Sequence, residues 1–176
     1  MTSLVKHLHA FVRETELTEK EWLTGIQFLT ATGKKCDDKR QEFILFSDVM
    51  GVSMLVDALN HPVSLDAFRS ITGEPAIRLV DGQATRYLPG HFLTSHDDGV
   101  DGQGRVAAFI INLTKDWRTD WGGLLQFHNP AGDVPLALKP GFNSIHLFRV
   151  PQMHSVTYVA PFAAKPRYAI TGWLRR

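Results

Sequence analysis

Two side chains near the middle of the chain have the types and the spacing of an incomplete metal site. His96 and Asp98 are separated by one residue at the end of the stretch Tyr87-Leu-Pro-Gly-His-Phe-Leu-Thr-Ser-His-Asp-Asp. On an extended strand, side chains alternate between faces, so we expect His96 and Asp98 to point the same way. A second histidine from a distant strand completes the set of two histidines and one carboxylate that holds non-haem Fe(II). If the register shifts by one residue, Asp97 becomes the carboxylate instead.

His154 is the strongest candidate for the third ligand. It follows Val150-Pro-Gln-Met and begins a predicted strand, where it can lie beside the strand of His96. His146 is the alternative, although its position inside the strand predicted at Ile145-His-Leu-Phe suits a core or surface side chain better. A single histidine is more often structural than a ligand, so the prediction depends on its partners.

Arg167 supplies the strongest of these supporting observations. It begins the stretch Arg-Tyr-Ala-Ile-Thr-Gly-Trp-Leu, in which Arg167, Ala169, Thr171 and Trp173 share one face of a strand. If that face looks into a barrel, the guanidinium requires an anion, because an unpaired buried charge is costly. A dicarboxylate that chelates the metal through its other end meets this requirement. An exposed arginine at the start of a strand is the alternative interpretation.

The composition excludes several classes of protein. The 176 residues are 44% hydrophobic and 21% charged, as in an ordinary soluble globular protein. A net charge of +1 argues against a dedicated nucleic-acid binder. The single cysteine, Cys36, forms no internal disulfide and favours a reducing compartment, and no apolar run approaches the roughly 20 residues that cross a bilayer. We therefore predict a cytoplasmic protein that binds neither membrane nor nucleic acid.

The elements that position these side chains fall into two parts. Helical periodicity in residues 1–62 predicts three helices, the last running from Asp37 or Asp38 to Asn60 before His61-Pro62 stops it. A short helix is expected at Ser64–Ser70 and a strand at Ala76–Val80. Short apolar runs separated by turn residues then predict strands at Thr85–Leu88, Val106–Leu113, Gly123–Phe127, Ser144–Val150, Ser155–Val159 and Arg167–Leu174. This order predicts an α+β fold with a sandwich or jelly-roll core in residues 63–176.

Residues 4–61 resemble the N-terminal helical domain of the intradiol catechol and hydroxyquinol dioxygenases. In that family the helices form a dimer interface and one side of the pocket for an aromatic substrate, so the resemblance implies a homodimer through these helices. The ferric ligands of the family, two tyrosines and two histidines, belong to a following domain, and this chain departs from the pattern directly after His61. The resemblance therefore does not imply ring cleavage here. It rests on Leu8-His-Ala-Phe-Val-Arg-Glu, Leu17-Thr-Glu-Lys-Glu-Trp, Cys36-Asp-Asp-Lys-Arg-Gln-Glu-Phe-Ile-Leu and Ser47-Asp-Val-Met-Gly-Val-Ser-Met-Leu-Val-Asp-Ala.

Residues 64–176 resemble the Fe(II)/2-oxoglutarate-dependent oxygenases of the prolyl 4-hydroxylase type. The matching motifs, in order, are Tyr87, His96-x-Asp98, Trp121-Gly-Gly-Leu-Leu-Gln-Phe, Pro140-x-Phe-Asn, His154-Ser-Val and Arg167-Tyr-Ala-Ile-Thr-Gly-Trp. The resemblance implies a double-stranded β-helix in which His96, Asp98 and His154 bind iron and Arg167 binds the C5 carboxylate of 2-oxoglutarate. It also implies that Tyr87 and Thr171 contact this cosubstrate, and it adds ascorbate as a further cofactor. Asn112 falls in the family's Tyr-Leu-Asn strand, where Ile110 replaces the tyrosine.

The sequence therefore predicts a dioxygenase that uses Fe(II), 2-oxoglutarate and O₂ to hydroxylate a C–H bond, with release of succinate and CO₂. The resemblance implies a protein or peptide substrate and a prolyl hydroxylase-like reaction. Two other interpretations stay open. One is a protein of aromatic catabolism related to the intradiol ring dioxygenases, and the other is an inactive jelly roll that serves binding or dimerisation. The last interpretation is motivated by the junction near His61, where the sequences of two families meet; a natural fusion, an engineered fusion or a misassembled sequence would give the same junction.

Overall fold

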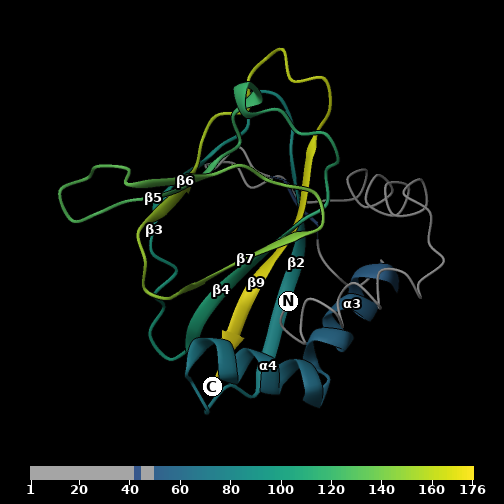
Figure 1. Cartoon of the computed structure of the whole chain (residues 1–176), viewed down its shortest axis with the longest axis vertical. Helices are drawn as coiled ribbons and strands as arrows, with labels where there is room; N and C mark the ends of the chain where they lie inside the picture. Colours follow the sequence, from purple (N-terminus) through teal and green to yellow (C-terminus); the bar gives the residue numbers. More distant parts are fainter. Residues whose placement is uncertain (1–41, 45–49) are drawn as a thin grey trace.

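Two antiparallel sheets build the part of the chain that the computed structural model describes, residues 42–44 and 50–176 (Figure 1). One sheet has five strands in the order β1-β2-β9-β4-β7, and the other has four in the order β3-β8-β5-β6. The elements in chain order are β1 (Glu42–Ile44), α3 (Met50–Asn60), α4 (Pro62–Thr72), β2 (Leu79–Tyr87), β3 (Leu93–His96), β4 (Arg105–Asn112), the 3₁₀ turn η2 (Thr119–Trp121), β5 (Leu125–Phe127), β6 (Leu136–Leu138), β7 (Ser144–Arg149), β8 (His154–Val156) and β9 (Arg167–Arg175).

Successive strands from β2 onward mostly alternate between the two sheets, which is the topology of a jelly-roll-like fold. The predicted strands at residues 106–113, 123–127, 144–150, 155–159 and 167–174 all correspond to observed strands within a few residues. The two strands expected at Ala76–Val80 and Thr85–Leu88 are one continuous strand, β2. An antiparallel jelly-roll-like fold with few helices is thus what the spacing of the short apolar runs predicts.

Strand β9 shows how one sequence pattern faces two environments. Its even-numbered residues Tyr168, Ile170 and Leu174 are buried in a core that also contains side chains of α3 and α4. Three of its odd-numbered residues, Arg167, Thr171 and Trp173, line a cavity between the two sheets. The two helices cover the outer face of the five-stranded sheet (Figure 1). The apolar face of β9 therefore packs on the helices, and its other face borders the cavity.

The helix α3 joins this core although it lies in the segment that resembles another family. Val52, Leu55 and Leu59 are at most 4% exposed and pack in the same cluster as sheet residues. Asn60 ends the helix, and its side-chain amide pairs with the backbone of Val80. Its Nδ2 donates to the carbonyl of Val80 at 2.7 Å, and its Oδ1 accepts from the Val80 N–H at 2.9 Å. The end of α3 is thereby fixed to the start of β2.

One predicted helix is wrong in part. The sequence pattern extends a helix from Asp37 or Asp38 to Asn60, but Glu42–Ile44 is the strand β1, and the helix α3 begins at Met50. Pairing with the free edge of β2 supplies hydrogen bonds to this segment that local periodicity cannot reveal, and tertiary pairing overrides helix propensity. The two earlier predicted helices, and the dimer predicted through them, lie outside the described residues. Among the described helices, none has the length and apolar character needed to cross a membrane.

Candidate metal centre and anion pocket

His96, Asp98 and His154 converge at one end of the four-stranded sheet, with ligand atoms that all lie within 4.8 Å of one another. The register of β3 and β8 places His96 directly opposite His154. The carboxylate of Asp98 lies between them, with Oδ1 3.6 Å from Nε2 of His96 and Oδ2 3.5 Å from Nε2 of His154. Neighbouring ligands of a metal with bonds of about 2.1 Å are roughly 3 Å apart, so these separations suit a shared ion.

Hydrogen bonds orient both imidazole rings. Nδ1 of His96 lies 2.8 Å from the carbonyl oxygen of Thr94, and Nδ1 of His154 lies 2.7 Å from that of Gln152. A carbonyl only accepts, so each Nδ1 carries the proton and each Nε2 presents its lone pair toward Asp98. Burial lowers the pKa of His154, which favours the neutral, metal-binding form. The donor set is therefore the one a divalent transition metal requires.

Asp98 reaches this position by a route that the sequence pattern does not predict. The strand β3 ends at His96, and Asp98 adopts a left-handed backbone conformation with φ 61°. The two side chains thus converge through a turn after the strand and not through strand alternation, which corrects the expected geometry. Asp97, the alternative carboxylate, is exposed and accepts a hydrogen bond from the Gly99 N–H, outside the cluster.

Arg167 is buried at the other side of the cavity, with only 1% of its surface exposed. Its Nη2 lies 3.5 Å from Oδ1 of Asn112, while Nε and Nη1 have no hydrogen-bond partner among the described residues. Burial lowers the pKa of this guanidinium, and the described neighbours include no carboxylate that pairs with it. Two unsatisfied donors on a buried cation are the feature expected of a site for a bidentate anion.

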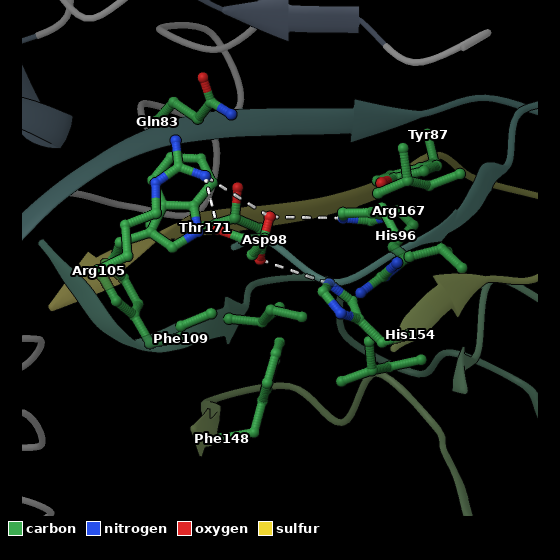
Figure 2. A pocket seen from close by; sticks show the side chains of 17 residues that line it. Gln83, Tyr87, His96, Asp98, Arg105, Phe109, Phe148, His154, Arg167 and Thr171 are labelled. Carbon is green, nitrogen blue, oxygen red and sulfur yellow. Dashed lines mark hydrogen bonds and ion pairs between the residues drawn. The ribbon is translucent and has the colours of Figure 1, made fainter. Parts of the chain in front are cut away.

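Tyr87 and Thr171 lie in the same cavity as Arg167. Tyr87 is the cross-strand partner of Arg167, whose guanidinium carbon is 5.1 Å from the centre of the phenol ring. Burial raises the pKa of Tyr87 to about 12, against the opposing effect of the Arg167 charge, so the phenol stays protonated. Thr171 also lines the cavity, and on β9 it lies opposite Ile110 of β4. All six residues singled out by the sequence therefore border one cavity of about 250 Å³ (Figure 2).

The Gly122-Gly123 pair after Trp121 lets the backbone of this turn approach the side chain of Arg167 closely. Gly122 and Gly123 both have positive φ, 67° and 63°, which favours glycine. A Cβ on Gly122 would clash with the carbonyl oxygen of Tyr158, and one on Gly123 would lie 3.3 Å from Cδ of Arg167. The turn thus packs its backbone directly on the stem of the arginine.

Several residues of the cavity were not singled out by the sequence. Phe148 packs edge-on against the ring of His154, with centroids 4.8 Å apart, and limits its rotation. Arg105 reaches Asp98 from the opposite side, and no motif marks it. His146, the alternative third ligand, lies on β7 opposite Ile110 of β4 and is not part of the converging group. Its pKa is lowered by burial and by the Arg167 charge.

Comparison with known proteins decides the family. The family model of the 2OG-Fe(II) oxygenase superfamily matches residues 82–175, more than half of the chain. The chain belongs to the 2OG-Fe(II) oxygenase superfamily. Fe(II) and 2-oxoglutarate, expected from the sequence, are the cofactors of these oxidoreductases, and O₂ is their co-substrate. The converging histidines and carboxylate and the unsatisfied donors of Arg167 fit these two groups.

Solved structures share the fold of this oxygenase. A prolyl-4-hydroxylase of Pseudomonas putida superposes with a TM-score of 0.66 at 18% identity, covering 98% of this chain and 87% of the other. A prolyl hydroxylase of Trichoplax adhaerens, in complex with a hypoxia inducible factor peptide fragment, gives a TM-score of 0.65 at 18% identity, covering 89% and 77%. At such identities these likenesses establish the fold and not the substrate.

The N-terminal part of this oxygenase matches another group. The family model of the catechol dioxygenase N terminus covers residues 1–67. A 6-chlorohydroxyquinol 1,2-dioxygenase of Cupriavidus pinatubonensis is 70% identical over 60 residues, 34% of this chain and 22% of its own length. A hydroxyquinol 1,2-dioxygenase of Rhodococcus opacus is 55% identical over 75 residues, 43% of this chain and 25% of its own. The chain thus spans about a quarter or less of the length of these relatives. Both expected resemblances are confirmed.

Proposed function

We propose that the protein is an Fe(II)- and 2-oxoglutarate-dependent dioxygenase that hydroxylates a C–H bond of a protein or peptide. In this reaction the substrate, 2-oxoglutarate and O₂ give the hydroxylated substrate, succinate and CO₂. One observation carries the proposal: a converging pair of histidines and a carboxylate shares a cavity with a buried arginine that has two unsatisfied donors.

His96, Asp98 and His154 would hold the iron through two Nε2 atoms and one carboxylate oxygen. Bound there, Fe(II) supplies the activation of O₂ that organic side chains cannot provide. The protein's own contribution is to fix the two histidine tautomers, through the Thr94 and Gln152 carbonyls, before the metal arrives. Three protein ligands leave three positions for the other components of the reaction.

Arg167 would bind the distal carboxylate of 2-oxoglutarate through Nε and Nη1. Because the guanidinium is buried, such a pair forms away from water and fixes the orientation of the cosubstrate. Tyr87 keeps its proton and can donate to the same carboxylate, while Thr171 borders the path between the arginine and the metal ligands. The cavity is lined mainly by apolar side chains elsewhere, which excludes water from the reacting groups.

The finer features belong to the same proposal. The alternation of strands between two sheets supports a double-stranded β-helix as the core, with residues 63–176 as the oxygenase domain. A peptide substrate is supported by the peptide bound to the Trichoplax adhaerens relative. The hydroxylated residue in prolyl hydroxylase-like chemistry is proline. Dimerisation through residues 1–62, a cytoplasmic location and a need for ascorbate remain predictions.

A role in aromatic catabolism is the second candidate, and it is favoured by the 70% identity of the N-terminal segment to a chlorohydroxyquinol dioxygenase. The segment accounts for 22% of that relative's length. An inactive jelly roll is the third candidate.

Binding spectra separate the three. Anaerobic protein with Fe(II) and 2-oxoglutarate should give the weak visible charge-transfer band of a chelated 2-oxo acid. The band should disappear in His154→Ala and Arg167→Ala. Colour that develops only when catechol is added to the ferric protein would point to the second candidate, and neither signal would point to the third. An Asp98→Ala protein that still forms succinate at the wild-type rate would sink the assignment.

A further inference from the structure

A second arginine lines the cavity at the end opposite Arg167. Figure 2 shows Arg105 on one side of Asp98 and Arg167, with Tyr87, on the other. Nη1 of Arg105 donates to the backbone carbonyl of Asp98 at 3.2 Å and lies 3.9 Å from its Oδ1. The guanidinium stacks on the ring of Trp173 with its central carbon 3.7 Å from the ring centre. Only 13% of the side chain is exposed.

These contacts leave hydrogen-bond donors unused. Nε of Arg105 is buried and has no partner among the described residues, and the same holds for Nε1 of Trp173. Both residues line the cavity, and Gln83 lines it beside them (Figure 2). A buried donor without an acceptor costs free energy, so this end of the cavity is built to receive oxygen atoms from a ligand.

The charges at this end point to the kind of ligand. Asp81, the other nearby carboxylate, forms an ion pair with Arg175, so Arg105 depends on Asp98 alone among the described carboxylates within 4 Å. With iron and cosubstrate in place, the charges of Fe(II), the 2-oxoglutarate dianion, Asp98 and Arg167 cancel. Arg105 then remains as one uncompensated positive charge in a site of low polarity, where its attraction for an anion is strong.

We propose that Arg105, stacked on Trp173, is the subsite for a carboxylate of the hydroxylated substrate. The substrate class is therefore an acid whose carboxylate lies close to the reacting C–H bond, either an acidic side chain beside the target residue of a peptide or a free carboxylic acid. The inference rests on the proposed function of the same cavity. It differs from the cosubstrate site because Arg167 and Arg105 lie on opposite sides of Asp98 (Figure 2).

A purely architectural role for Arg105 makes a different prediction. If the guanidinium serves only to hold the backbone of Asp98, its removal should weaken metal and 2-oxoglutarate binding whatever the substrate carries. If it binds the substrate, its removal should leave the charge-transfer band of the anaerobic Fe(II)–2-oxoglutarate protein intact and abolish only the preference for acids. Arg105→Gln tests this, because glutamine retains a donor for the Asp98 carbonyl and lacks the charge.

Two pairs of matched probes distinguish the sources of the carboxylate. N-acetylproline is compared with N-acetylprolinamide, and the peptide acetyl-Gly-Pro-Asp-amide with acetyl-Gly-Pro-Asn-amide, by calorimetric titration of the anaerobic Fe(II)–2-oxoglutarate protein. One charge-assisted pair is expected to favour the acid over its amide roughly tenfold or more. A preference confined to the first pair indicates a free acid, and one confined to the second indicates an acidic peptide.

In Arg105→Gln the acid and its amide should bind equally, with the band unchanged. Arg149→Gln is the matched control, since Arg149 on β7 donates to the carbonyl of Thr72 and does not line the cavity. It should keep the preference. If Arg105→Gln fails to fold, Trp173→Phe replaces it, because phenylalanine keeps an aromatic ring for stacking and lacks the Nε1 donor. A reduced preference for acids is then expected.

Three results would overturn the inference: no acid preferred over its amide by the wild type, a preference that survives in both variants, or loss of the band in Arg105→Gln. Failure of the proposed function has a separate signature. The wild-type protein would then show no band before any probe is added, whereas a normal band without discrimination between the paired probes would discard the Arg105 subsite alone.

Discussion

His96 and His154 are directly paired across β3 and β8, and the centres of their imidazole rings lie 4.2 Å apart. Two residues 58 positions apart in the sequence are thus brought face to face by a single register between strands. A shift of that register by one residue would turn one ring away from the other. The candidate metal centre is therefore as well defined as the pairing of the two strands.

Loss of either ring should remove the metal. In His154→Ala the affinity for Fe(II), or for Mn(II) as a probe, should fall by more than about a hundredfold, because outer-shell changes alone cost 10- to 100-fold. The Mn(II) signal in electron paramagnetic resonance measures this directly. His128→Ala removes a histidine that follows β5 and is bonded to Ser155, and this variant should bind the metal as the wild type does. Equal affinity of the two variants would contradict the assigned ligand.

Replacing Arg167 should affect the cosubstrate and not the metal. Arg167→Lys keeps the charge but cannot donate two parallel hydrogen bonds, so we expect 2-oxoglutarate to bind about 10- to 100-fold more weakly. The titration of the charge-transfer band gives this value, and the Mn(II) affinity should be unchanged. Arg149→Lys provides the control, because Arg149 lies on β7 of the same sheet and donates to the carbonyl of Thr72 outside the cavity. Unaltered 2-oxoglutarate binding in Arg167→Lys would rule out the bidentate contact.

Tyr87 should make the fold sensitive to alkaline pH. Burial raises its pKa from 10 to about 12, so the unfolded chain loses the phenolic proton at a lower pH than the folded one. The resulting stability is fully present below pH 10 and is lost as the pH rises toward 12, by about 2–3 kcal/mol. Denaturant unfolding of wild type and Tyr87→Phe between pH 9 and 12 should show a shallower decline in the variant. Tyr158→Phe, at an exposed phenol, should follow the wild type, and parallel curves for all three would reject the prediction.

Asn60 should stabilise the junction between the helical segment and the sheet. Its side chain makes three hydrogen bonds to backbone groups of Val56 and Val80. Asn60→Ala removes all three and leaves the Val80 groups unsatisfied, so the free energy of unfolding should fall by about 2–3 kcal/mol. Asp57→Ala, at an exposed position of the same helix, should change it by less than about 0.5 kcal/mol. Chemical denaturation that gives the same value for both variants would refute this role.

The sequence predicts many of the residues that line the cavity, because the alternation of side chains along a strand depends only on local sequence. The face shared by Arg167, Thr171 and Trp173 follows from alternation alone, and these three residues line the cavity. Asp98 shows where local rules end, since its left-handed conformation depends on the turn after β3 and not on residue type. Arg105 was missed because its contact with Trp173 depends on the pairing of β4 with β9, which no local pattern reveals.

The helical part shows the opposite limit. Periodicity correctly predicts that a helix ends before His61-Pro62, where Pro62 begins α4. It wrongly extends that helix back over Glu42–Ile44, because pairing with an edge strand leaves no trace in a segment of three residues. The roles of the six cavity residues in binding metal and cosubstrate remain predictions that the variants above can test.

The attachment of Asn60 to Val80 bears on how such a chain can be recombined. Two sequence families meet near His61, yet Val52, Leu55 and Leu59 on one side share a hydrophobic interior with Val80 and Leu174 on the other. The two parts of the chain are therefore joined by a packed hydrophobic interface as well as by the backbone at His61. A graft of the corresponding segment from a hydroxyquinol dioxygenase should be accepted only if it preserves these three apolar positions and the asparagine that locks them to the sheet.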